Sequence, residues 1–111
     1  MSHLTTHVLD TASGLPATGL RLELHRLLEH GTRHRLGAWH TNAAGRTDAP
    51  LLAGPDVMAG DYELLFDVAG WRSQDGFYGA IPIRFRIDDP NANYHVPLIL
   101  APFGYSTYRG S

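Results

Sequence analysis

A two-residue periodicity of apolar side chains constrains the fold of this chain more than any other feature. It recurs in residues 20–25, 62–68 and 81–87, where apolar and mostly polar positions alternate. Residues 94–100 alternate in the same way, and the N-terminus places Leu4 and Val8 opposite His3, Thr5 and His7. Successive side chains of a strand point to opposite faces, so the pattern predicts strands with one buried and one exposed face.

Turn residues separate these segments, as in Ser13-Gly14-Leu15-Pro16 and Asp89-Pro90-Asn91. Short strands with frequent turns indicate an all-β chain folded as an antiparallel sandwich or barrel. A single weak helix is expected at Ala69–Gly76. With 111 residues and no internal repeat, residues 1–111 are expected to form a single domain.

Two prolines interrupt the predicted strands, Pro82 and Pro97. Proline cannot donate a hydrogen bond to a sheet, so each is expected at a sheet edge, a strand start or a bulge. Edge strands can pair with another chain. Together with the aromatic C-terminal segment 103–108, the prolines favour an oligomer.

Missing residue types exclude several function classes. Without cysteine the chain has no disulfide, no thiol nucleophile and no cysteine zinc site. Without lysine it has no Schiff-base chemistry and no phosphate-loop lysine. A formal net charge of −2 disfavours nucleic acid as a partner. No Gly-x-Ser-x-Gly motif places a serine nucleophile.

The sequence also bears on the expected location. The sequence has no run of 18 apolar residues, which is about the length that a membrane-spanning helix needs. The first residues lack the basic and apolar regions of a secretion signal. We therefore expect no membrane partner and a cytoplasmic protein.

The chain has seven histidines, and metal binding is the first function to test for them. His3 and His7 would share a strand face but lie about 13 Å apart, too far to bind one ion. His30 and His34 straddle a turn and give only a weak pair. His25, His30 and His34 stand among charged residues, as solvated side chains do. We expect no metal and no cofactor.

Three other features could serve catalysis or ligand binding, and each also has a purely structural interpretation. His7 and His95 lie on the faces opposite the core, where they would meet water, a pocket or a second subunit. The segment Gly45–Asp48 is expected to begin a strand, where Arg46 either pairs with a carboxylate or grips a ligand with its planar guanidinium. The tail from Tyr105 to Ser111 either frays or docks to line a polar pocket. Trp39 and Trp71 are interpreted as packing residues.

Three motifs resemble those of the 5-hydroxyisourate hydrolases, the transthyretin-related enzymes. They are His7-Val8-Leu9-Asp10-Thr11 with Gly14 and Pro16-Ala17, then Gly45-Arg46-Thr47, then Tyr94-His95-Val96-Pro97-Leu98 with the terminal Tyr105-Ser106-Thr107-Tyr108-Arg109-Gly110-Ser111. The resemblance spans the whole chain, and the terminal Tyr-Arg-Gly-Ser separates these enzymes from true transthyretins. Three motifs in order are stronger evidence than any one of them.

The resemblance implies a transthyretin-like sandwich of two four-stranded sheets with one short helix. It also implies a homotetramer, a dimer of dimers with active sites at the dimer–dimer interface. The implied reaction is hydrolysis of 5-hydroxyisourate to 2-oxo-4-hydroxy-4-carboxy-5-ureidoimidazoline in urate degradation, without metal, cofactor or covalent nucleophile. The family's catalytic residues correspond to His7, Arg46 and His95, and its substrate-binding residues to Tyr108, Arg109, Gly110 and Ser111. Which histidine activates water stays open.

Two other functions remain as alternatives. The first is a non-catalytic transthyretin-like carrier that binds an aromatic ligand in the tetramer channel, and the second is a sandwich interaction module without a ligand. A carrier of hydrophobic ligands needs an apolar channel, whereas two histidines and two arginines would make this one polar. An interaction module would not require the polar residues of all three motifs.

Overall fold

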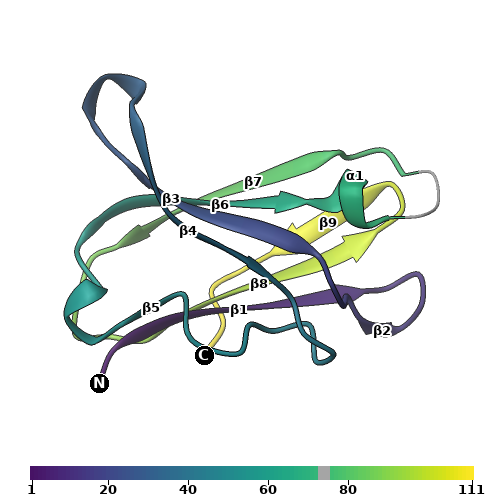
Figure 1. Ribbon diagram of the computed structural model, residues 1–111, viewed down its shortest axis with the longest axis horizontal. Helices are drawn as coiled ribbons and strands as arrows, with labels where there is room; N and C mark the ends of the chain where they lie inside the picture. The colour runs from purple at the N-terminus through teal and green to yellow at the C-terminus, as the bar shows by residue number, and fades with distance from the viewer. Residues whose placement is uncertain (73–75) are drawn as a thin grey trace.

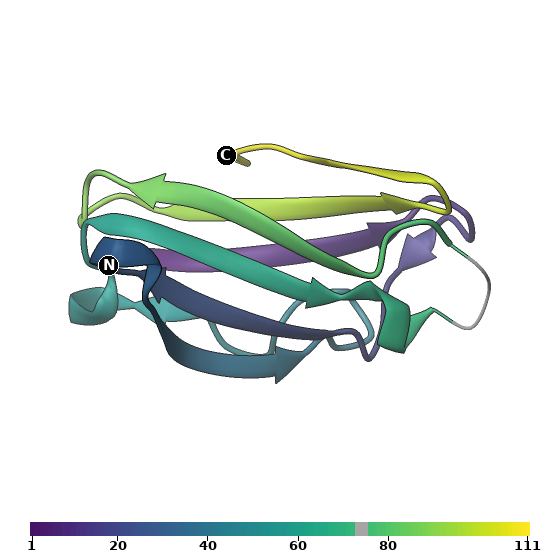
Figure 2. The same cartoon turned by 90° about the horizontal axis from the view of Figure 1, so that it is seen from above.

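The computed structural model describes residues 1–72 and 76–111, which form two β-sheets packed face to face (Figures 1 and 2). The first sheet has the order β2-β1-β8-β9, and the short β5 also pairs with β1. The second has the order β4-β3-β6-β7. The strands are β1 (His3–Asp10), β2 (Leu15–Pro16), β3 (Arg21–Leu27), β4 (Arg33–His40), β5 (Leu52–Ala53), β6 (Gly60–Asp67), β7 (Ala80–Ile87), β8 (Tyr94–Ala101) and β9 (Gly104–Thr107).

This architecture confirms the predicted fold class, an all-β sandwich with one short helix. The first sheet differs from the expected four strands because β5 is added as a fifth. Both β2 and β5 are only two residues long and pair with opposite ends of β1. β1 pairs with β8 in parallel, and the other strand pairs are antiparallel.

The core lies between the sheets and follows the predicted alternation. Leu4 and Val8 of β1 are fully buried, as are Leu22 and Phe66 of the second sheet. The histidines of β1 point to the opposite, outer face and are half-buried. The pattern in the sequence therefore assigns the two faces of β1 correctly.

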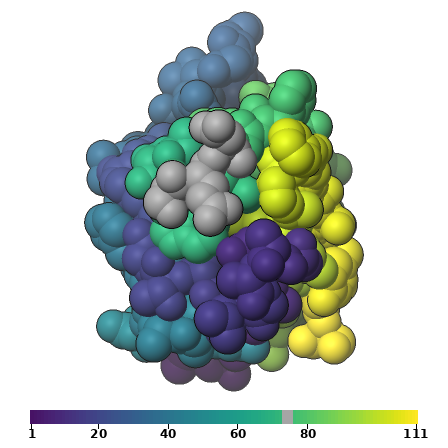
Figure 3. All heavy atoms as spheres, turned by 90° about the vertical axis from the view of Figure 1, so that its right-hand side faces the viewer, coloured from purple at the N-terminus to yellow at the C-terminus, as the bar shows by residue number. Residues whose placement is uncertain are grey.

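The helix α1 (Val68–Trp71) is shorter than predicted and begins one residue earlier. The Asp67 side chain accepts a hydrogen bond from the Gly70 amide at 3.0 Å and caps its start. Of the predicted 69–76 helix, residues 73–75 lie outside the described part of the chain. In the end view of Figure 3, green residues of the middle of the chain lie beside yellow C-terminal residues, and the Arg72 guanidinium, just after α1, donates to the Ala101 carbonyl oxygen of β8 at 3.2 Å.

The segment Gly45–Asp48 does not begin a strand, contrary to the prediction. Residues 42–50 form turns and bends instead. The Asn42 Oδ1 atom accepts hydrogen bonds from the amides of Ala44 at 2.9 Å and Arg46 at 3.2 Å. A side chain that binds amides two and four residues ahead folds the backbone into a turn, which competes with strand pairing.

The two prolines have different positions. Pro82 lies in β7, at the edge of its sheet, as predicted. Pro97 lies in β8, between β1 and β9, so the expectation of an edge position is wrong for it. The structure accommodates it because the β8–β9 ladder ends at the pair Leu98–Thr107, so the adjacent Pro97 has no paired residue in β9. The prediction therefore did not consider that proline can lie in a central strand, here β8, where the neighbouring strand β9 ends.

The outer face of the second sheet carries a network of arginines and carboxylates. Its centre is Glu63 in β6, whose side chain is only 2% exposed. Glu63 pairs with Arg33 near the start of β4 and with Arg84 of β7, at 3.0 Å for the latter. One carboxylate thus joins the two edge strands across the sheet.

We predict that Glu63→Gln lowers the free energy of unfolding by about 1–2 kcal/mol, because two charged hydrogen bonds to a buried group are lost. Both arginines can turn to water, which keeps the loss moderate. The matched control is Asp61→Asn, which removes the 53%-exposed partner of Arg86 and should cost less than about 0.5 kcal/mol. Urea denaturation of both variants measures this difference. Equal losses of unfolding free energy in the two variants would mean that the burial of Glu63 does not strengthen its ion pairs.

Candidate active site

The parallel pairing of β1 with β8 brings the two candidate histidines to one face. Its register sets Thr5 opposite His95 and His7 opposite Pro97. All four side chains therefore lie on the outer face of the first sheet, away from the core. His7 and His95 are both half-buried there.

The loop that carries Arg46 reaches this face through Gly45. The Val8 amide donates to the Gly45 carbonyl oxygen at 2.8 Å, which fixes the loop against β1. Gly45 has a φ of 74° and is buried, and a Cβ there would collide with the Val8 carbonyl and lie 3.3 Å from the His7 ring. Only glycine fits this position without strain, so the loop can approach His7 closely. Arg46 itself is exposed at the mouth of the site.

The chain terminus packs on His95. The Gly110 amide donates to the His95 carbonyl oxygen at 2.8 Å. A Cβ at Gly110 would lie 2.5 Å from His95 Cδ2, so a larger residue would displace the ring or the tail. The tail is therefore docked rather than frayed, because residues 105–107 belong to β9, which pairs with β8, and Gly110 is held on His95.

A polar cavity of about 280 Å³ opens between these elements. His95, Arg46 and Ser111 line it together, although they are far apart in the sequence. His7 is close enough to Arg46 and His95 for their charges to affect one another. The full lining of the cavity is His3, Thr5, Arg46, Asn93, Tyr94, His95 and Ser111.

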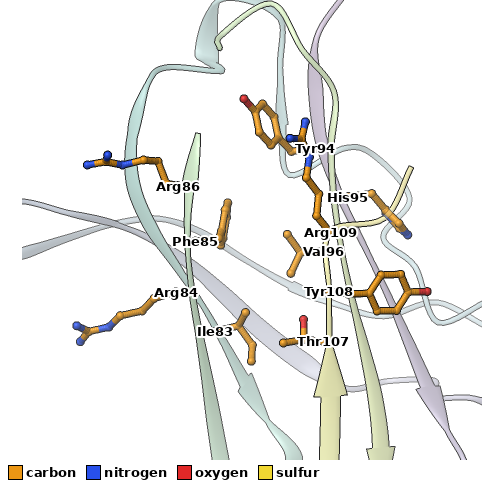
Figure 4. Close-up of a pocket in the computed structure, with 10 residues that line it drawn as sticks. All are labelled: Ile83, Arg84, Phe85, Arg86, Tyr94, His95, Val96, Thr107, Tyr108 and Arg109. Carbon is orange, nitrogen blue, oxygen red and sulfur yellow. The ribbon is translucent and has the colours of Figure 1, made fainter. Parts of the chain in front are cut away.

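Tyr108 and Arg109 lie beside this cavity, in a neighbouring groove of about 270 Å³ between β7 and β8 (Figure 4). The Arg109 guanidinium stacks over the Tyr94 ring at 4.5 Å and donates to the Asn93 carbonyl oxygen at 3.3 Å. The Tyr108 ring points away from the apolar residues of the groove in Figure 4. In the single chain the tail is thus divided between two hollows, which share Tyr94 and His95.

Both histidines have pKa values below their ordinary 6.5. Partial burial of the His7 ring is the main cause of its lowered pKa, and the Arg46 charge adds to it, while a backbone hydrogen bond to Ala44 acts in the opposite direction. Burial also lowers the pKa of His95 most, followed by Arg46 and His7, against a backbone hydrogen bond to Thr5. Near pH 7 both imidazoles are therefore mainly neutral and can accept protons.

Several lining residues were missed by sequence reasoning, which named His7, Arg46, His95 and the tail. Thr5, Asn93 and Tyr94 were not considered as site residues. A correct β1–β8 register would have identified Thr5, because it lies directly opposite His95. The alternation placed His3 and Thr5 on the same face as His7, but nothing in the sequence specified which strand lies beside β1.

In residues 1–72 and 76–111, no three His, Asp or Glu side chains gather as a metal site would require. The same residues contain no helix long and apolar enough to cross a bilayer. The absence of metal and cofactor stays a prediction, which the assay below includes.

We predict that His7 and His95 titrate below pH 6.5 when their ring resonances are followed by NMR. The unfolded chain then binds protons more readily than the folded one, so the free energy of unfolding should fall as pH drops below about 6.5. Replacing both histidines by glutamine should flatten this dependence. Peptides that contain each histidine alone provide the reference. Titration of both rings at the peptide values would contradict the prediction.

Comparisons with known proteins agree with the geometry. The HIUase/Transthyretin family matches residues 4–110. The 5-hydroxyisourate hydrolase 2 of Rhizobium meliloti (strain 1021) is 49% identical over 115 residues, covering 97% of this chain and 95% of the relative. The solved 5-hydroxyisourate hydrolase of Klebsiella pneumoniae is 37% identical, with a TM-score of 0.85 and full coverage of both chains.

Two further structures show the range of this fold. Transthyretin from Sparus aurata has a TM-score of 0.89 over 99% of this chain and 97% of its own, at 23% identity, which shows a shared fold. A structure of (S)-allantoin synthase has a TM-score of 0.89 and 40% identity over 99% of this chain, which spans only 44% of that longer protein. The match over residues 4–110 and the identities to the hydrolases confirm the resemblance: the chain belongs to the HIUase/Transthyretin family.

Proposed function

We propose that this chain is a 5-hydroxyisourate hydrolase, with residues 1–111 as its one hydrolase domain. The observation that carries this proposal is the meeting of Arg46, His95 and Ser111 around one polar cavity next to His7. Relatives with 49% and 37% identity bear this name, whereas the transthyretin match is 23% identical. The reaction would take place in the cytoplasm, as cell fractionation can test.

The reaction needs a deprotonated water and a stabilised oxyanion. One histidine takes a proton from water, and the oxygen attacks the ring amide carbon. The carbonyl electrons move to its oxygen, where the Arg46 guanidinium offsets the negative charge. As the C–N bond breaks, the ring nitrogen takes a proton from the other histidine, and the first histidine passes on the proton that it took from water, so that both imidazoles end neutral. The six-membered ring opens, a carboxylate forms, and the product is 2-oxo-4-hydroxy-4-carboxy-5-ureidoimidazoline.

The lowered pKa values suit this chemistry. A neutral imidazole accepts the proton of water, and once protonated it is a stronger acid than an ordinary histidine. The positive charge of Arg46 repels a protonated imidazole, which lowers the pKa of both histidines. The same charge attracts the negative charge of the transition state and so stabilises it. We assign catalysis to His7, Arg46 and His95, and substrate binding to Tyr108, Arg109, Gly110 and Ser111.

We also propose that the active chain is a homotetramer built as a dimer of dimers. The catalytic face is the outer face of the first sheet, and Arg46 is exposed on it, so a facing subunit would be needed to exclude water from the substrate. Tyr108 is 58% exposed and Arg109 lies beside the cavity, so their substrate-binding role would require this assembly.

The decisive test follows the absorbance of 5-hydroxyisourate while urate oxidase produces it. The wild-type chain should accelerate its loss, also in the presence of a chelator. Loss of His7 or His95 should each lower the rate by about 10²–10⁴-fold, since each transfers a proton. Arg46→Lys should cost about 10²-fold, because an ammonium does not reproduce the two parallel hydrogen bonds of a guanidinium. Deletion of 108–111 should abolish activity.

A matched control is His34→Gln, which changes an exposed histidine of the β3–β4 hairpin and should leave the rate unchanged. Thermal melts establish that each variant folds, and the tail deletion should, because the core residues lie elsewhere. A folded wild-type chain that leaves the decay unchanged would sink the hydrolase proposal and favour the carrier. A rate that is lost on chelation and restored by zinc would contradict the metal-free reaction.

Sedimentation velocity tests the assembly separately. At micromolar concentration the chain should sediment as a tetramer. Activity per chain should fall on dilution if subunits enclose the site. A stable and fully active monomer would overturn the proposed assembly but not the chemistry.

A further inference from the structure

We propose that Thr5 is a positioning residue that holds His95 with its proton on Nδ1, so that the Nε2 lone pair faces the cavity as the base that activates water. This inference rests on the proposed hydrolase function and goes further, because it selects one of the two histidines. Thr5 is not among the residues that the family resemblance supplied. It acts through His95 and is therefore not itself a catalytic residue.

The contact is built into the sheet. Thr5 lies opposite His95 in the parallel β1–β8 register, and its Oγ1 lies 2.8 Å from His95 Nδ1. Both side chains line the polar cavity. Threonine is branched at Cβ and therefore has few side-chain rotamers, so a strand fixes its hydroxyl well. With Nδ1 engaged, Nε2 is the ring nitrogen left for water or substrate.

The direction of this hydrogen bond decides the chemistry. A threonine hydroxyl can donate or accept, so the distance alone permits both tautomers. A base that activates water needs its lone pair on the ring nitrogen that is free, which is Nε2 because Thr5 engages Nδ1. In a neutral imidazole the other nitrogen carries the proton, so Nδ1 donates and the Thr5 hydroxyl accepts. The backbone of Thr5 acts in the same direction, because it raises the pKa of His95.

Other ionisable groups near His95 affect its charge without choosing its tautomer. Arg46 and His7 lower the pKa of His95 through their charges, from the loop and from β1. Gly110 packs against Cδ2 with its backbone and offers no titratable side chain. The charged or titratable groups that line the two hollows together with the ring are His3, Arg46, Arg84, Arg86, Tyr94, Tyr108, Arg109 and the chain end at Ser111, and His7 acts on the ring through its charge.

The first experiment reads the tautomer directly and needs no substrate. Nitrogen-15 NMR of the wild-type chain, labelled at histidine, distinguishes a protonated from an unprotonated ring nitrogen. At a pH where His95 is neutral, we expect Nδ1 to carry the proton and Nε2 to be free. A proton on Nε2 would overturn the proposal, whether or not the chain hydrolyses 5-hydroxyisourate.

The second experiment compares Thr5→Val with Thr5→Ser, which keeps the hydroxyl. Valine should lower kcat by about 10- to 100-fold with little change in KM, since partners that orient a histidine act at this scale. Serine should restore most of the rate. The valine variant also removes an acceptor that stabilises the protonated ring, so the acidic limb of the pH–rate profile should move to lower pH. A shift to higher pH would mean that the hydroxyl donates to Nδ1, and would overturn the assignment.

The matched control is Thr6→Val, in the next residue of the same strand. The Thr6 hydroxyl donates to the Val96 carbonyl oxygen at 2.7 Å inside the core and does not face His95. Its loss should lower stability but leave the His95 tautomer and titration unchanged. If Thr5→Val and Thr6→Val changed the tautomer and titration of His95 equally, the role of Thr5 would be only structural. If Thr5→Val does not fold, the wild-type tautomer and the serine variant still decide the question.

Discussion

The parallel pairing of β1 with β8 is the contact on which both the core and the site depend. It places Leu4 opposite Tyr94 and Val8 opposite Leu98, all of them buried. The positions between them set Thr5 against His95 on the outer face. A shift of one residue would turn every side chain of β1 to the wrong face, so the apolar residues that stabilise the sandwich also fix the geometry of the polar cavity.

Close backbone approach at two glycines completes the site. Gly45 carries the Arg46 loop over β1, and Gly110 brings the chain end onto His95. A side chain at either position would collide with Val8 or with the His95 ring. Glycine is therefore required at both positions for steric reasons, independently of any role that the two motifs have in the reaction. The single chain nevertheless leaves Arg46 exposed, which is why the proposed function includes a facing subunit.

The alternation of residues predicted most of the strands and the two faces of β1, because burial of one sheet face determines that pattern. Local turn chemistry was harder to predict: Asn42 folds the segment that had been interpreted as a strand start. Pro97 was expected at an edge, a strand start or a bulge, and its position in a central strand was missed because the end of β9 beside it depends on tertiary structure. The site residues came from the family resemblance, and residue spacing alone could not have paired Thr5 with His95, 90 positions away.

Histidines of this chain differ according to the partners that the sheets provide. On the second sheet, Nε2 of His25 lies 2.9 Å from a Glu23 oxygen, so the partner of this ring is a carboxylate. On the first sheet, the partner of His95 is a hydroxyl, with Arg46 nearby. A carboxylate in place of Thr5 would orient the ring equally well, but it would raise the pKa of His95 and offset the Arg46 charge that an oxyanion requires. An uncharged partner orients the base while leaving it neutral, which is the condition that water activation near pH 7 needs.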